Sequence, residues 1–273
     1  SIRFMRIFMK DFKDDIVLRF ATLDLVRGEW RTYTQAIQAP GEYVSGDQSN
    51  STLFEMSAVN LEENSSREPV PYVIPPGIYQ EVYTGTVSTI RQNEQALQLS
   101  VENLTDGDAR AVYKTTSFDF RYYKKMKMFV HAEKMYEHDD LEDGDLTVFL
   151  RFGSDLTDNY YEYEVPLKFT EWYTSSTDDF AIWPEENNIE IDFEELVEVK
   201  NNRNKSLGKN NVQTNREYTE YSGKNKIKVL GNPTISEVRN MMIGVRNPKN
   251  NNEADTDKSA IIWINELRLT DLN

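Results

Sequence analysis

The sequence predicts an all-β protein, a sandwich of antiparallel sheets with one short helix. Three observations lead to this prediction. Apolar residues alternate with polar ones over several short segments, turns rich in Asp, Gly and Asn separate these segments, and only one segment has helical spacing. Many short antiparallel strands with few helices are typical of a β-sandwich.

The alternation is clearest in residues 126–133, 146–152 and 160–165. One face of each segment is apolar and carries Met126, Met128, Val130, Ala132, Leu146, Val148, Leu150, Phe152, Tyr161, Tyr163 and Val165. In the first and third segments the other face is polar and carries Lys127, His131, Glu133, Glu162 and Glu164. Half-buried antiparallel strands show this period of two, so we expect the polar face to lie in water.

The single helical segment begins near Asp192. Acidic residues occupy its first turn, where the helix dipole favours negative charge. The side predicted to pack against the sandwich consists of Phe193, Leu196, Val197 and Lys200.

The last strand, residues 261–269, contains a change of phase. Its apolar positions follow every second residue up to Ile264 and then resume at Leu267. One extra residue near Asn265 and Glu266 accounts for this change, so we predict a β-bulge there. A closing strand of this type resembles the final strand of galactose-binding-like jelly rolls, and the expected fold is therefore a jelly-roll β-sandwich.

The same change of phase occurs in residues 18–25, and the strands that precede the two bulges, residues 2–7 and 238–243, are also alike. This similarity predicts a partial internal repeat. Residues 1–37 are then the last two strands of an upstream β-sandwich, and residues 87–273 form a complete jelly-roll domain.

Residues 38–86 are predicted to be a Pro-rich connector between these parts. Its second half contains Val70-Pro71-Tyr72-Val73-Ile74-Pro75-Pro76. Proline fixes φ and removes a backbone donor, so we expect this stretch to be extended and to lie outside a sheet interior. The apolar residues between the prolines predict that it packs along a surface, unlike a free linker.

The charge balance excludes several partners. The 273 residues include 46 Asp+Glu and 31 Lys+Arg, a net charge of −15. Nucleic acids and anionic membranes attract basic surfaces, so neither is expected to bind.

The lack of Cys excludes disulfides and thiol nucleophiles. No run approaches the roughly 18 apolar residues of a membrane helix, no signal peptide is visible, and we expect the chain to be part of a longer polypeptide.

Five segments, ordered along nearly the whole chain, carry a resemblance to a known family. They are residues 28–33, 70–78, 106–114, 118–133 and 263–269. Through them the chain is similar to the SprA family (also called Sov), the outer-membrane translocons of the type IX secretion system, which are linked to gliding motility.

The resemblance implies a non-catalytic structural or docking module of a giant translocon whose remainder is a large β-barrel. It implies a soluble portion associated with the outer membrane, exposed at the cell surface or in the periplasm, that caps or gates the channel or binds other proteins. The expected partners are other domains of the same chain, outer-membrane partner proteins and secreted cargo. Lipid-facing strands need a continuous apolar face, so the polar second faces predict no direct lipid contact.

No arrangement of residues typical of catalysis is visible. Glu162 and Glu164 share a strand face, but among 46 acidic residues such pairs are expected by chance. His131 and His138, the two histidines, belong to no Ser/His/Asp or His-x-x-x-His pattern. We therefore expect neither an enzyme nor a cofactor.

Acidic residues offer one candidate metal site. Asp139, Asp143 and Asp145 lie in one loop, and Glu266 lies in the closing strand, near which jelly rolls often hold a structural calcium. Their oxygens suit calcium, although the spacing is not that of an EF-hand. The alternative is a charged turn that keeps the surface soluble.

Aromatic residues offer a candidate binding platform, formed by Tyr161, Tyr163, Trp172 and Trp183. Exposed rings of this kind would bind a glycan or a partner protein, whereas buried rings would simply fill the core. The alternative function is accordingly a carbohydrate-binding jelly-roll module of a secreted polysaccharide-processing protein.

Overall fold

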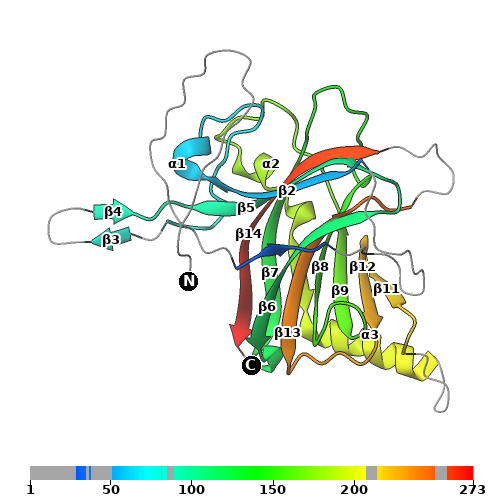
Figure 1. The fold of residues 1–273 in the computed structure, drawn as a ribbon. Coiled ribbons are helices and arrows are strands. Elements are labelled where there is room, and N and C mark those ends of the chain that lie inside the picture. Colours follow the sequence, from blue (N-terminus) through cyan, green and yellow to red (C-terminus); the bar gives the residue numbers. More distant parts are fainter. Residues whose placement is uncertain are drawn as a thin grey trace, which may run out of the picture.

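Two antiparallel β-sheets pack face to face in the computed structural model (Figure 1). The structure describes residues 29–34, 37, 51–80, 82–84, 89–206, 214–249 and 257–272. In the seven-stranded sheet the order is β1-β6-β13-β8-β9-β12-β11, and in the five-stranded sheet it is β10-β7-β14-β5-β2.

The strands of the seven-stranded sheet are β1 (Arg31–Thr32), β6 (Ala109–Phe118), β8 (Thr147–Gly153), β9 (Tyr160–Pro166), β11 (Tyr218–Ser222), β12 (Asn225–Leu230) and β13 (Val238–Arg246). Those of the five-stranded sheet are β2 (Leu53–Asn60), β5 (Gln95–Leu104), β7 (Tyr123–Lys134), β10 (Ile189–Asp192) and β14 (Lys258–Leu272). The chain crosses from one sheet to the other at each step from β5 to β8, at each step from β9 to β11, and again from β13 to β14. This connectivity confirms the predicted jelly-roll β-sandwich.

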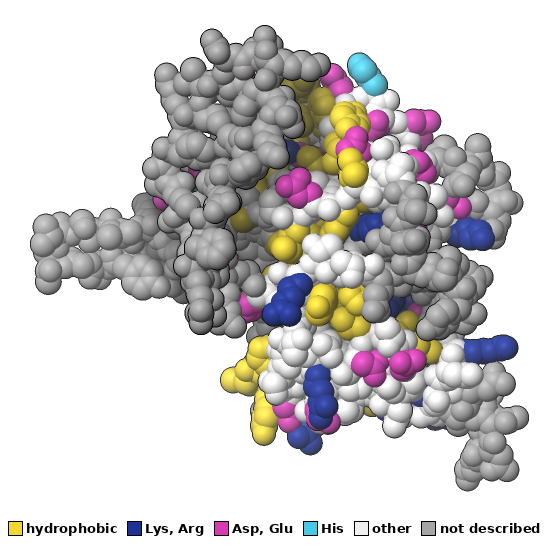
Figure 2. All heavy atoms as spheres, in the orientation of Figure 1, with side chains coloured by type: hydrophobic (Ala, Val, Ile, Leu, Met, Phe, Trp, Pro, Cys, Tyr) yellow, Lys and Arg dark blue, Asp and Glu magenta, His cyan; other side chains and the backbone are white. Residues whose placement is uncertain are grey.

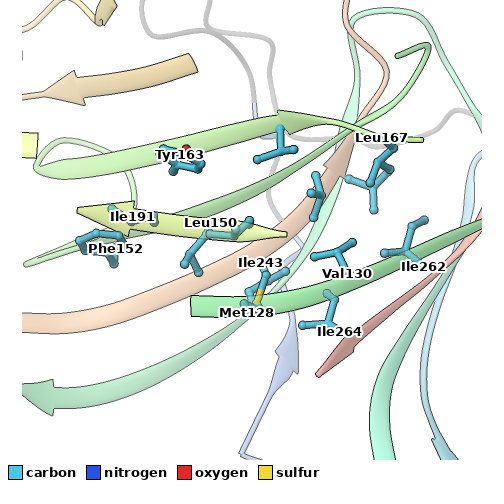
Figure 3. Packing of buried hydrophobic residues seen from close by; sticks show 14 of the residues in the cluster. Met128, Val130, Leu150, Phe152, Tyr163, Leu167, Ile191, Ile243, Ile262 and Ile264 are labelled. Carbon is cyan, nitrogen blue, oxygen red and sulfur yellow. The ribbon is translucent and has the colours of Figure 1, made fainter. Parts of the chain in front are cut away.

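The main core lies between the two sheets, where the predicted apolar faces meet. Figure 3 shows Met128 and Ile262 of the five-stranded sheet among Leu150, Tyr163 and Ile243 of the seven-stranded sheet. Burial of this large apolar area is the main favourable contribution to folding.

The predicted bulge in the last strand is confirmed. The pairing of β14 with β7 shifts register between Asn265 and Arg268. Glu266 adopts a positive φ of 54°, and its backbone N–H donates to Asn265 Oδ1 at 2.7 Å. Leu267 consequently returns to the core side and packs against the main core.

Helix α3 (Phe193–Ser206) is the predicted helix. Asp192 accepts a hydrogen bond from the Glu194 backbone N–H at 2.9 Å, at the helix start. The buried side consists of Phe193, Leu196, Val199 and Arg203. Val197 was expected on this side but is 38% exposed, because the buried positions follow Phe193 at spacings of three, three and four residues and Val197 falls outside that stripe.

The remaining helices are short: α1 (Leu61–Asn64), η1 (Phe120–Tyr122), α2 (Asp179–Ile182) and η2 (Glu185–Asn187). Within the described ranges, none of the helices has the length and apolar composition needed to cross a membrane. Strands β3 (Val82–Thr84) and β4 (Thr89–Arg91) pair as a separate hairpin that projects from the body (Figure 1).

The sandwich begins earlier in the chain than residue 87. Strand β1 pairs with β6, and strand β2 pairs with β5 along eight residues. Each of these strands satisfies backbone groups that would otherwise form an open sheet edge. Residues 1–28, which hold most of the expected upstream remnant, lie outside the described residues.

The Pro-rich stretch covers the outer face of the five-stranded sheet. We call residues 67–75 the proline strap. As predicted, it is not a strand and packs on a surface, with Val70 and Tyr72 fully buried. These side chains belong to a second small core, formed by Val59, Val70, Tyr72, Ala96, Ile182, Trp183 and Trp263.

We predict that Trp183→Ala destabilises the fold by about 3–5 kcal/mol, because the fully buried ring leaves a cavity under the proline strap. The Trp183 indole also donates to the Val73 carbonyl at 2.9 Å. Denaturant unfolding measures the loss. Phe180→Ala is the matched control, since that ring lies in the short helix α2, which ends just before Trp183, but is exposed. Equal stability of the two variants would contradict this description of the second core.

Candidate functional site

Most residues of the polar strand faces are buried, which corrects the expectation that they lie in water; Lys127 is half-buried. Glu133, His131 and Glu162 each have 0% exposure, and Glu164 has 1%. The alternation identified the two faces correctly but could not show that further layers of chain cover the outer ones.

Five charged residues form what we call the β9 ion cluster: Arg151, Glu162, Glu164, Lys228 and Arg246. They come from four adjacent strands, and the register places Glu162 beside both Arg151 and Lys228. Glu162 accepts from Arg151 Nε at 2.8 Å, from Lys228 at 2.9 Å and from Arg246 at 2.8 Å. Glu164 accepts from Lys228 at 2.6 Å and also contacts Arg246.

Aromatic rings complete the surroundings of the two guanidinium groups. Arg246 lies 4.5 Å from the centroid of the Phe149 ring, and Arg151 lies 4.0 Å from that of Tyr160. Gly244 makes room for Phe149, because a Cβ at this position would come within 2.4 Å of that ring. The cluster is thus held by packing as well as by charge.

The carboxylates of the cluster are ionised. Burial alone would raise the pKa of Glu162, but Arg246, Arg151 and Lys228 outweigh burial and hold it well below its usual range. The pKa of Glu164 is likewise raised by burial but lowered overall by Arg246 and Lys228. Each oxygen of Glu162 makes two contacts with cations, Oε1 with Lys228 and Arg246 and Oε2 with Arg151 Nε and Nη2, so no lone pair is left to act on a substrate.

Glu217 differs from these two glutamates. Burial and the nearby Glu162 raise its pKa, and it accepts a hydrogen bond from the Tyr160 hydroxyl at 3.0 Å. Glycoside hydrolysis requires a carboxylic acid with a raised pKa next to an ionised carboxylate. Here, however, both oxygens of Glu162 are held in ion pairs, so Glu162 cannot act as the catalytic carboxylate. We therefore assign Glu217 to the same structural network.

A second polar cluster fastens the proline strap to the five-stranded sheet. Arg67 of the strap donates to Glu133, and His131 Nε2 lies 3.6 Å from the same carboxylate. His131 Nδ1 donates to the Ile182 carbonyl at 2.6 Å, and the His131 ring stacks on Trp263 with centroids 4.0 Å apart. Burial raises the pKa of Glu133, but His131 and Arg67 lower it overall.

The expected calcium ligands do not come together. Asp143 accepts from the Phe169 backbone N–H at 2.8 Å, and Asp145 pairs with Lys258 at 3.2 Å. Glu266 lies eight residues beyond Lys258 along β14, roughly 26 Å away at strand spacing. Among the described residues, which include Asp139, no group of three or more His, Cys, Asp or Glu could hold a metal.

The four expected platform residues do not form one surface. Tyr161 and Tyr163 belong to the main core, and Trp183 belongs to the second core. Trp172 is half-buried and, with the exposed Tyr173, lines a small pocket at the end of β7. Of the four residues, Trp172 alone is accessible to a ligand.

An exposed apolar surface lies at the opposite end of the sandwich. We call Phe118, Tyr122 and Leu272 the basal patch; all three are exposed, and Leu272 pairs with Tyr123 at the start of β7. A groove of about 420 Å³ at this end is lined by Arg121, Tyr123, Lys124, Phe193, Glu194, Val197, Glu198, Asn201, Lys205 and Ile235. Sequence reasoning missed this patch because its members come from the ends of separate elements. The signal that was available is the aromatic run at residues 118–123.

These features define a jelly-roll sandwich whose buried charged groups join the strands of one sheet and fasten the proline strap to the other, and whose ends carry the accessible surfaces. Over residues 1–273 the chain matches the family SprA_N, described as motility related/secretion protein. The chain therefore belongs to the SprA_N family, and the resemblance seen in the sequence is confirmed.

No curated protein matches the chain. Among solved structures, one similar chain is a carbohydrate-binding module, CBM28, specific for non-crystalline cellulose. The two are 14% identical, the match covers 70% of this chain and 80% of that one, and the TM-score is 0.27. A TM-score of this size carries no argument about what this chain binds.

We predict that Arg246→Met lowers the free energy of unfolding by about 3–5 kcal/mol, because it leaves two buried carboxylates short of a cation. Arg239→Met is the matched control on the same strand, since the Arg239–Glu237 pair is exposed. Denaturant unfolding of both variants measures the difference. A loss no larger than that of the control would refute a structural role for the cluster.

Stability should also fall at acid pH. In the folded chain the pKa values of Glu133, Glu162 and Glu164 lie below their usual range, about 4.3 for glutamate. Below that value the unfolded state binds more protons, so the stability present at neutral pH is lost as pH falls through the lowered values. Thermal unfolding from pH 7 to pH 2.5 measures this, and a melting temperature independent of pH would contradict it.

Proposed function

We propose that the chain is a non-catalytic docking module of a secretion translocon associated with the outer membrane. In this role it helps to cap or gate the channel or binds partner and cargo proteins. Membership of a motility-related secretion family supports the setting. The observation that carries the docking role is the basal patch, a cluster of large exposed apolar side chains on a chain of net charge −15.

The two sheet faces support the same conclusion by a different argument. Both outer faces are occupied by the chain's own side chains, in the β9 ion cluster and under the proline strap. An incoming protein would have to displace paired charges or a packed core there, at considerable cost in free energy. The ends of the sandwich are the surfaces that a partner can contact without such a cost.

A carbohydrate-binding function is the second candidate. The predicted platform does not form, because three of its four rings are buried in two separate cores. Of the predicted platform, only Trp172 remains accessible, beside a small pocket.

The test replaces Phe118, Tyr122 and Leu272 by serine together in the full translocon. We expect the variant module to keep its melting temperature, because all three side chains are exposed, and to lose co-purification with the translocon's partners and most cargo export. Export is measured as cargo appearing in the culture medium.

The matched control is Tyr221→Ser, which removes an equally exposed ring from the edge strand β11. This variant should behave like the unmodified protein. Normal export and normal co-purification of the triple variant would overturn the docking role of the basal patch.

A further inference from the structure

A small pocket lies at the end of the sandwich opposite the basal patch. It is lined by Lys134, Glu137, Phe169, Thr170, Glu171, Trp172 and Tyr173 and has a volume of about 230 Å³. Pockets that enclose a whole small-molecule ligand usually have about 300–1,000 Å³. The size therefore suits a single protein side chain better than an extended ligand.

Two aromatic rings form adjacent walls of this pocket. Trp172 and Tyr173 lie 6.1 Å apart with their planes at 88°. The Trp172 indole N–H donates to the Lys134 carbonyl at 3.1 Å, which fixes the ring, while the Tyr173 ring is 66% exposed. A cation that enters the pocket therefore meets aromatic side chains, whose ring faces carry partial negative charge.

The backbone holds Tyr173 in an unfavourable conformation. Its φ is 64°, in the left-handed region that non-glycine residues rarely adopt. Its N–H donates to the Pro69 carbonyl at 2.9 Å, so the loop is tied to the proline strap. A strained backbone conformation that holds an exposed ring in a fixed position indicates a functional role for that ring.

The charge of the pocket favours a cation. Glu137 and Glu171 are both exposed, and within the described part of the chain neither carboxylate has a hydrogen-bond or ion-pair partner. The ammonium of Lys134, the cation that lines the pocket, donates to the Asp139 carbonyl at 3.2 Å. Acidic side chains gather over the upper end of the face in Figure 2, the end at which β7 finishes in Figure 1.

From these observations we propose that the pocket is a socket for an arginine side chain of a partner protein. A guanidinium group stacks on aromatic faces and donates to carboxylates at the same time, which an ammonium group does less well. The socket rests on the proposed docking function and specifies the partner chemistry at this end of the module.

The test titrates the module with the capped tripeptide Gly-Arg-Gly and, as a matched probe, with the same peptide containing citrulline, which keeps the shape but lacks the charge. Tryptophan emission and calorimetry are the readouts. Trp183 and Trp263 are buried, and the titration uses a Trp30→Phe background because Trp30 is half-buried like Trp172, so quenching reports chiefly on Trp172. We expect saturable binding of the arginine peptide that weakens with salt, and at least about tenfold weaker binding of the citrulline peptide.

Two variants separate binding from folding. Glu171→Gln should weaken binding at least about tenfold without changing the melting temperature. Tyr173→Gly should abolish binding while leaving the melting temperature unchanged or higher, because glycine tolerates the positive φ. Lys124→Gln, at the other end of the sandwich, is the control and should bind normally.

Three results would overturn the socket: no saturable binding of the arginine peptide, equal binding of the citrulline peptide, or binding of cellobiose in its place. None of them bears on the basal-patch experiment, whose readout is co-purification and export. Failure of the socket and failure of the docking function are therefore distinguishable.

Discussion

The ion pairs of Glu162 and Glu164 are the constraint on which the rest of the structure depends. They occupy the middle of the seven-stranded sheet and join four strands through side chains as well as through the backbone ladder. Two buried carboxylates are tolerable only when cations surround them, so the positions of Arg151, Lys228 and Arg246 are set by them. Because these charges are already compensated within the sheet, the groups that remain accessible to a partner lie at the two ends of the module.

Much of the fold could be predicted from local patterns. Alternation identified the core faces of β7, β8 and β9, and the phase change in the last strand located the bulge at Asn265 and Glu266. These features depend on a period of two along one strand, which a sequence displays directly. The membership of β2 in the five-stranded sheet depends on pairing with β5, some forty residues away, and that information is not local.

The candidate sites were less predictable for the same reason. The sequence does not show that the proline strap covers the Trp183 ring. Nor does it show that three cations from neighbouring strands surround Glu162. Trp172, one of the four platform candidates, is half-buried, and its neighbour Tyr173 is distinguished by a backbone angle that the sequence does not reveal. The basal patch assembles only when the ends of β6, η1 and β14 meet.

The length of β7 has a mechanical consequence. The basal patch lies at its first residue and the pocket at its last, so twelve residues of continuous strand, about 40 Å, separate the two surfaces. If partners bind at both ends and pull, the force acts along the strands. It then shears many backbone hydrogen bonds at the same time, instead of breaking them one after another. The module would then act as a stiff spacer that transmits pulling forces with little extension.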